Sequence, residues 1–110
     1  MPRKDTRFKD YEGFKSKDKH IRLTASMMLS DNYLKLSNSA KVVYEYMKLW
    51  ACGENVFQYS QSNSNKYMSN KTYVKARDEL IEKGFIEYVA TNQFAHIPNS
   101  YKFSNKWKEI

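Results

Sequence analysis

The 110-residue chain has little cysteine, glycine or proline and no long hydrophobic run. Cys52 is its only cysteine, so an intramolecular disulfide is impossible, and a four-ligand zinc site would have only His20 and His96 to add to that thiol. No apolar stretch follows the charged N-terminus, which argues against a signal peptide and a membrane-spanning helix. We therefore expect a cytoplasmic protein without a membrane partner.

Features that carry catalysis are missing from the sequence as well. With three glycines there is no glycine-rich phosphate loop, and no spaced carboxylate pair, nucleophile–base set or metal-binding cluster is visible. We therefore expect a protein that is not an enzyme and that needs neither a cofactor nor a metal.

Positive charge and aromatic side chains are abundant. Lysine and arginine number 19 against 12 acidic residues, a net charge of +7 that favours an anionic partner, nucleic acid first. Hydrophobic residues make up 41% of the chain, too much for a disordered polycation, and the length fits one domain. The charge pattern predicts a basic, flexible arm over residues 1–19 and a folded domain over 20–110.

Hydrophobic periodicity outlines this domain. Two strong helices are predicted, over 37–52 and 69–83, each beginning at a serine or asparagine cap and ending at a glycine. Their apolar stripes are Ala40, Val43, Tyr44, Met47 and Trp50 in the first, and Tyr73, Ala76, Leu80 and Ile81 in the second. Weaker patterns predict a helix over 25–36, a brief helix over 60–67, and strands over 56–59, 85–90 and 100–104.

This order of elements is typical of an α+β winged helix-turn-helix, with a three-helix core and a small antiparallel sheet that includes a hairpin wing. In that architecture the short strand after the first strong helix joins the hairpin, and the last helix can enter the major groove of DNA. An unrelated small α+β domain is the alternative.

The charges of the helix over 69–83 run against its dipole. Lys71 and Lys75 lie in its first turns, and Asp78 and Glu82 lie later on the same face, opposite the apolar stripe. Contacts from basic residues to DNA phosphates would account for this inversion. The alternative is a solvated charged face held by pairs such as Lys75 with Glu79.

Other candidate DNA contacts lie in the turn before this helix, in the hairpin and in the arm. Asparagine can read adenine, and hydroxyls and basic side chains can bind phosphates. The loop over 91–96 contains no lysine or arginine, a departure from wings that grip the minor groove. The full set of predicted DNA-binding residues is Lys66, Ser69, Asn70, Lys71, Thr72, Lys75, Gln93, His96, Lys102, Arg3, Lys4 and Arg7.

The many aromatic residues allow two interpretations. Stacking on single-stranded bases is one, and packing in a core or a dimer interface is the other. We favour the core, because most of them fall on the predicted buried stripes.

Several motifs resemble a known family. The segments 20–23, 27–30 and 36–44, then 69–76 and 79–87, and finally 98–101 are similar to the winged-helix domain of plasmid replication initiators of the RepA amino-terminal type from low-GC Gram-positive bacteria. The resemblance implies binding of double-stranded DNA in the maintenance of a plasmid or conjugative element. The longer carboxy-terminal part of a full initiator does not follow here, which favours a small accessory protein.

Two functions remain as hypotheses. The first is a dimeric, sequence-selective DNA-binding protein that acts at an operator or origin in replication, transfer or transcriptional control. The second is a winged-helix adaptor that recruits a relaxase or a replication protein through its aromatic surface. The basic arm and the charge inversion favour DNA, and the uncharged hairpin loop favours a protein partner.

Overall fold

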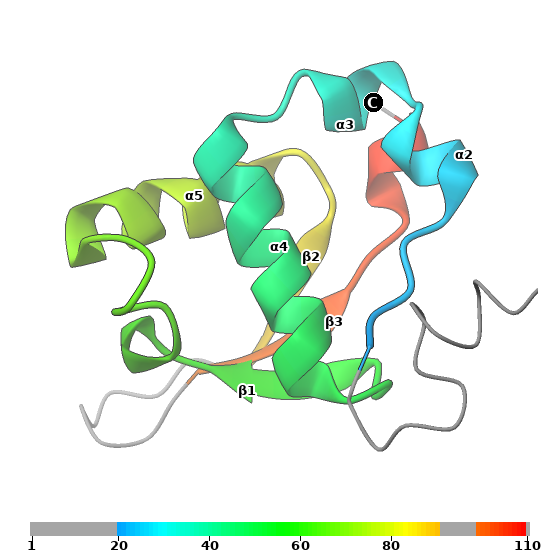
Figure 1. Cartoon of the computed structure of the whole chain (residues 1–110). Coiled ribbons are helices and arrows are strands. Elements are labelled where there is room, and N and C mark those ends of the chain that lie inside the picture. The colour runs from blue at the N-terminus through cyan, green and yellow to red at the C-terminus, as the bar shows by residue number, and fades with distance from the viewer. Residues whose placement is uncertain (1–19, 91–98, 110) are drawn as a thin grey trace, which may run out of the picture.

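A computed structural model describes residues 20–90 and 99–109. Within them the chain forms a compact α+β fold with four α-helices and a three-stranded antiparallel sheet (Figure 1). The helices are α2 (Ala25–Met28), α3 (Asp31–Leu34), α4 (Asn38–Ala51) and α5 (Asn70–Glu82), and two short 3-10 helices are η1 (Gln61–Asn63) and η2 (Lys106–Glu109).

The sheet joins strands that are far apart in the sequence. Its strands are β1 (Val56–Tyr59), β2 (Ile86–Ala90) and β3 (Asn99–Phe103), in the spatial order β1-β3-β2. Tyr101 of β3 lies opposite Phe57 of β1 and Tyr88 of β2. The predictions of an antiparallel hairpin and of a short strand that joins it are therefore confirmed, β1 with its predicted bounds and the hairpin strands with bounds shifted by one residue.

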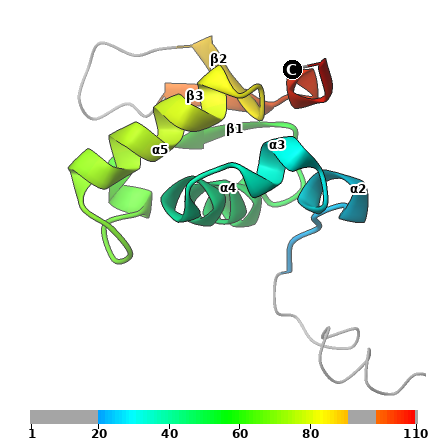
Figure 2. The same ribbon diagram turned by 90° about the horizontal axis from the view of Figure 1, so that it is seen from above.

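The two long helices form where periodicity placed them, and they pack against each other (Figure 2). Ser37 is the N-cap of α4, because its Oγ accepts a hydrogen bond from the amide of Ala40 at 3.1 Å. Cys52 ends α4 with a left-handed backbone, φ 52° and ψ 41°, so the turn begins one residue before the predicted stop, Gly53.

Trp50 was expected in the apolar stripe of α4, and that expectation is wrong. Its side chain is 54% exposed, whereas Ala51 is buried. Four residues turn a helix by about 400°, so Ala51 returns to the face of Met47, whereas three residues turn it by about 300° and carry Trp50 to the edge of the stripe.

The predicted helix over 25–36 is broken into α2 and α3. Ser30 between them has an extended backbone, φ −69° and ψ 147°. Its Oγ accepts from the amide of Tyr33 at 3.2 Å and donates to the carbonyl of Met27 at 2.6 Å. A serine that satisfies both the end of one helix and the start of the next replaces the hydrogen bonds of a continuous helix.

The predicted helix over 60–67 shrinks to the three residues of η1. The amide of Ser60 donates to Oδ1 of Asn63 at 2.9 Å, and the hydroxyls of Ser60 and Ser62 share a hydrogen bond of 2.7 Å. The first of these bonds belongs to a capping box, which begins a helix, but the serines and asparagines that follow compete for backbone hydrogen bonds, so only one 3-10 turn forms.

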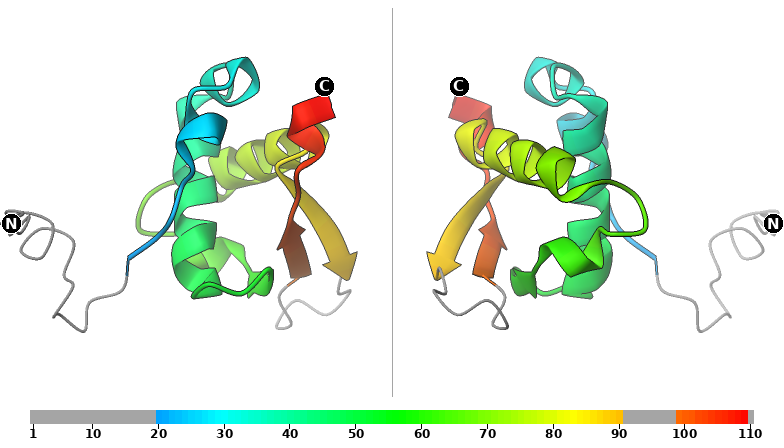
Figure 3. Two further views of the ribbon diagram at one scale, coloured as in Figure 1. Left: turned by 90° about the vertical axis from the view of Figure 1, so that its right-hand side faces the viewer. Right: turned by 90° about the vertical axis from the view of Figure 1, so that its left-hand side faces the viewer.

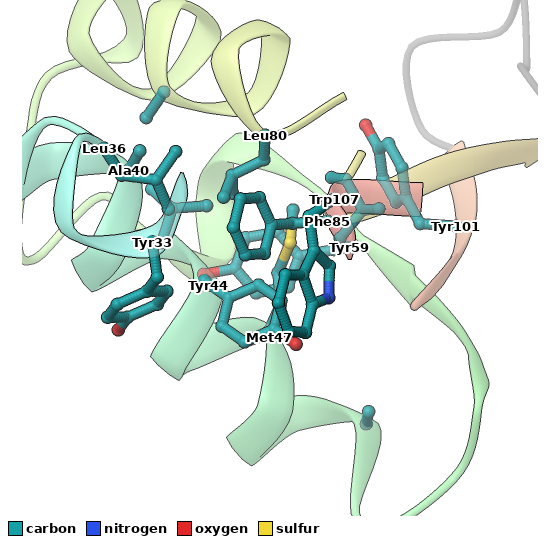
Figure 4. Packing of buried hydrophobic residues seen from close by; sticks show 14 of the residues in the cluster. Tyr33, Leu36, Ala40, Tyr44, Met47, Tyr59, Leu80, Phe85, Tyr101 and Trp107 are labelled. Carbon is teal, nitrogen blue, oxygen red and sulfur yellow. The ribbon is translucent and has the colours of Figure 1, made fainter. Parts of the chain in front are cut away.

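A single core lies between α4, α5 and the sheet. Met47, Leu80, Phe85 and Tyr101 are fully buried there, and the ring of Trp107 stacks on that of Phe85 at 5.7 Å (Figure 4). Of the aromatic residues, Tyr33, Tyr44, Phe57, Tyr59, Tyr73, Phe85, Tyr101 and Trp107 are buried. The favoured interpretation of the aromatic residues as core is therefore confirmed for most of them.

Gly84 lets the C-terminal segment close over this core. Its φ is 84°, and a Cβ added there would lie 2.7 Å from the backbone nitrogen of Trp107. Only glycine accepts both the left-handed backbone and so close an approach. Its carbonyl accepts a hydrogen bond from Trp107 at 3.1 Å, which holds η2 in place.

Candidate nucleic-acid interface

The start of α5 is held by its own side chains. Ser69 is the N-cap, because its Oγ accepts from the amide of Thr72 at 3.2 Å. The same hydroxyl donates to Oγ1 of Thr72 at 3.0 Å. Two of the predicted DNA contacts, Ser69 and Thr72, thus have a structural role in fixing the first turn.

The charged face of α5 lies where the periodicity predicted. Tyr73, Ala76 and Leu80 are buried, whereas the side chains on the opposite side of the helix are exposed. The exposed residues of this face are Lys71, Lys75, Asp78 and Glu82. Ile81, also expected in the stripe, is only partly buried against the core.

Two of the acids on α5 are engaged by other residues. Asp78 accepts from Nε and Nη2 of Arg77 at 3.1 and 3.0 Å. Glu79 accepts from the amide and the hydroxyl of Ser37 at 2.8 and 2.7 Å, so its carboxylate points to the start of α4. The pair of Lys75 with Glu79, which was the example given for a solvated charged face, is therefore not formed among the described residues.

The basic residues at the start of α5 differ from these acids. Among the described residues neither Lys71 nor Lys75 makes a salt bridge, and both are exposed. Asn70 and Lys66 are exposed next to them. The unpaired backbone N–H groups of a helix start add positive charge, so this end of α5 is electropositive.

The turn that leads into α5 is attached to α4 by an aromatic pair. The rings of Tyr46 and Tyr67 stack with centroids 4.0 Å apart and an interplanar angle of 18°. Tyr67 directly follows Lys66 and keeps half of its surface exposed. The pair attaches the residue next to Lys66 to α4. Its two members are too far apart in the sequence for hydrophobic periodicity to predict their contact.

Lys102 lies apart from this group. It follows the buried Tyr101 on β3, so it projects from the outer face of the sheet, away from the core. Glu87 is its partner on β2. The pKa of Glu87 is lowered mainly by its hydrogen bond with Lys106, then by one with Ser104, and the charge of Lys102 adds to the effect. Lys102 thus faces an acidic group.

The predicted contacts Arg3, Lys4, Arg7, Gln93 and His96 lie outside the described residues. Of the predicted set, the structure brings Lys66, Ser69, Asn70, Lys71, Thr72 and Lys75 together at one end of α5.

Sequence reasoning overlooked Arg77. It lies on the flank of α5, its guanidinium 5.9 Å from the centre of the Tyr73 ring. Burial alone would lower its pKa, but the hydrogen bond to Asp78 and the nearby Tyr88 and Tyr101 leave that pKa raised. Its position in the sequence, between the buried stripe and the charged face of α5, could have indicated this role. Its part is to neutralise Asp78 beside the basic residues.

Within residues 20–90 and 99–109, no group of three or more histidine, cysteine, aspartate or glutamate side chains is placed to hold a metal ion. In the same residues no helix is long and apolar enough to cross a membrane. No family model matches the sequence, and neither a curated protein nor a solved structure matches the chain.

Proposed function

We propose that the chain is a winged-helix protein that binds double-stranded DNA, with α5 as the recognition helix in the major groove. The single observation that carries this proposal is the basic start of α5, where Lys66, Lys71 and Lys75 are exposed and, within the described part of the chain, make no salt bridge. The acids Asp78 and Glu79 are held by Arg77 and Ser37.

The shape of the fold supports this docking. An α-helix with its side chains is about 10–12 Å wide, which fits a major groove of about 12 Å. The core stripe of α5 holds it against α4, and its opposite face is exposed over its whole length. The charge distribution then favours entry by the N-terminal half, because Glu82 near the other end would repel phosphates.

The residues at this end divide into two roles. Lys71, Lys75 and Lys66 bind phosphates and set the register of the protein on the duplex. Asn70, exposed at the first position of α5, is placed to read a base edge. Ser69 and Thr72 hold the turn and add a hydroxyl each.

The test is a duplex titration over a range of salt concentrations with the double variant K71A K75A. Each lost phosphate contact reduces the slope of log K against log salt by about 0.9, so we expect the slope to fall by about 2. K83A is the matched control, because Lys83 is an exposed lysine at the other end of the same helix. Equal effects of K83A and of a single K75A variant would contradict the assignment.

The biological setting follows the family resemblance. We propose action at an operator or origin of a plasmid or conjugative element, by a homodimer whose two α5 helices reach successive half-sites. Sedimentation of the protein with and without a cognate duplex tests the dimer. A monomer on a single half-site would remove this part of the proposal and leave DNA binding intact.

The alternative function is an adaptor for a protein such as a relaxase or a replication enzyme. Large exposed apolar side chains favour it: Leu29 is 75% exposed and Leu34 is 56% exposed. A chain that binds no duplex at low salt would make this the better proposal.

A further inference from the structure

A cleft with an unusual charge balance lies beside the C-terminal half of α4. Two adjoining cavities of about 420 and 290 Å³ make it up. The segment over 20–24 runs alongside α4 (Figure 3). Its residues line the two cavities and so form one wall of the cleft. Arg22, Lys48, Asn55 and Phe103 line both cavities, so they mark the centre of the cleft.

This cleft is far from the basic start of α5. In two perpendicular views the start of α5 lies at one side of the molecule and the segment over 20–24 at the other (Figures 1 and 2). The two basic regions are thus separate surfaces, and a substitution in one leaves the other intact.

The lining is rich in cations and poor in acids. Among the described lining residues the basic side chains are Arg22, Lys48 and Lys108, with His20 beside them, and Glu54 is the only acid. Within the described part of the chain, neither Arg22 nor Lys48 makes a salt bridge. Cations that converge on a concave surface without matching carboxylates attract anions.

Lys48 is the most informative member. Its Nζ lies 4.1 Å from the centre of the Phe103 ring and 5.7 Å from that of Tyr44. Burial lowers the pKa of its ammonium group. This half-buried ammonium lies over two ring faces, from a lysine in the last turn of α4, and among the described residues it makes no salt bridge to a carboxylate. An anion in the cleft would supply the missing charge.

The chemistry of the cleft selects a phosphate group over a nucleobase. A base needs a free aromatic face, but Phe103 is stacked on Phe57 at 4.6 Å with Lys48 over its ring. Trp107 is likewise stacked on Phe85 and is only 7% exposed. What the cleft offers instead is N–H donors, from Arg22, from Lys48 and from the side chains of Asn55 and Asn105.

We propose that the cleft around Arg22 and Lys48 is a phosphate-binding site, separate from α5. Arg22 binds two phosphate oxygens through its planar guanidinium, and Lys48 contributes a point charge from the opposite wall. The phosphate comes either from a nucleic-acid backbone that passes beyond α5 or from a small phosphate ester.

The test is an NMR titration of the full chain with inorganic phosphate, at constant ionic strength maintained with chloride. We expect saturable shifts of the backbone amides of Arg22, Lys48 and Asn55, and a rise in the pKa of the Lys48 ammonium when phosphate binds. In the variant R22Q K48M the affinity falls by about ten-fold or more, because two charge-assisted contacts are lost. Methionine keeps an apolar side chain over Phe103.

Two controls keep the test decisive. K71A K75A changes the other basic surface, and phosphate must still shift the amides around Lys48 in that variant. If K48M weakens the fold, R22Q alone carries the comparison, because Arg22 is exposed. Shifts that do not saturate, or that persist unchanged in R22Q K48M, would overturn the proposal.

The source of the phosphate is decided with a duplex. A backbone source predicts that R22Q K48M lowers the salt slope of duplex binding in addition to the effect of K71A K75A. A small ester as the source predicts that R22Q K48M binds the duplex as tightly as the unsubstituted chain does, although its affinity for phosphate has fallen. Because the phosphate titration contains no DNA, its failure is independent of the failure of the DNA-binding function.

Discussion

We expect the contact between Glu79 and Ser37 to make a measurable contribution to stability. The carboxylate of Glu79 on α5 accepts from both the amide and the hydroxyl of Ser37, at 2.8 and 2.7 Å, and Ser37 is the N-cap of α4. It therefore joins the two long helices and places a negative charge at the positive end of α4. The variant E79A removes both hydrogen bonds and that charge.

The magnitude follows from the position of the contact. A hydrogen bond to a charged group contributes about 1.5–3 kcal/mol in a buried site, but solvent screens this contact, so we expect E79A to lower the free energy of unfolding by about 1–2 kcal/mol. For a domain of this size that is a decrease in Tm of roughly 4–16 °C. The measurement is urea unfolding followed by circular dichroism.

The matched control is E82A, which replaces an exposed acid of α5 by the same residue, so the gain in helix propensity from alanine cancels. S37A also removes the N-cap hydrogen bond from the amide of Ala40, so we expect it to lower the free energy of unfolding by about 1 kcal/mol. In the double-mutant cycle E79A and S37A are expected to couple by about 0.5–1 kcal/mol. Additive effects, or an E79A variant as stable as E82A, would refute the argument.

Two other predictions concern the C-terminal part of the fold. G84A is expected to lower the free energy of unfolding by more than about 2 kcal/mol, because the added Cβ meets backbone atoms of Lys106 and Trp107. The control G53A has a similar φ but open space around the added atom, so we expect a decrease of about 1 kcal/mol. Equal decreases in urea unfolding would contradict this explanation. Glu87 has a lowered pKa in the folded state, mainly because of its hydrogen bond with Lys106, so its contribution to stability is full above its ordinary pKa and is lost as the pH falls through the lowered value. E87Q should therefore flatten the acid side of the stability–pH curve, and an unchanged curve would show that the pair with Lys106 does not contribute.

Local patterns were sufficient where an element depends on its own residues. The stripe Tyr73, Ala76 and Leu80 and the cap Ser69 predicted α5, because a helix of this length needs one buried face and a satisfied first turn. The hairpin followed from alternation on either side of a polar loop. The same helical periodicity, about 100° per residue, predicted that Lys71 and Lys75 lie on the exposed face.

Those patterns do not predict where side-chain hydrogen bonds or tertiary packing change an element. The periodicity over 25–36 does not show that Ser30 ends one helix and begins another. The Ser30 hydroxyl bonds the carbonyl of Met27 in α2 and the amide of Tyr33 in α3, and hydrophobic spacing carries no information about such bonds. In the same way, Trp50 and Ala51 both fit an apolar end of α4, and only the packing against the sheet decides which one is buried.

The sequence by itself determined the net positive charge, the two long helices, the hairpin and the inverted charges of α5, because each depends on composition or on neighbours within one or two helical turns. The tertiary structure decided which charges are neutralised. Glu79 lies beside Ser37 of another helix, and Arg22 shares a cleft with Lys48. No periodicity relates such pairs, since the packing of one element on another sets their distance.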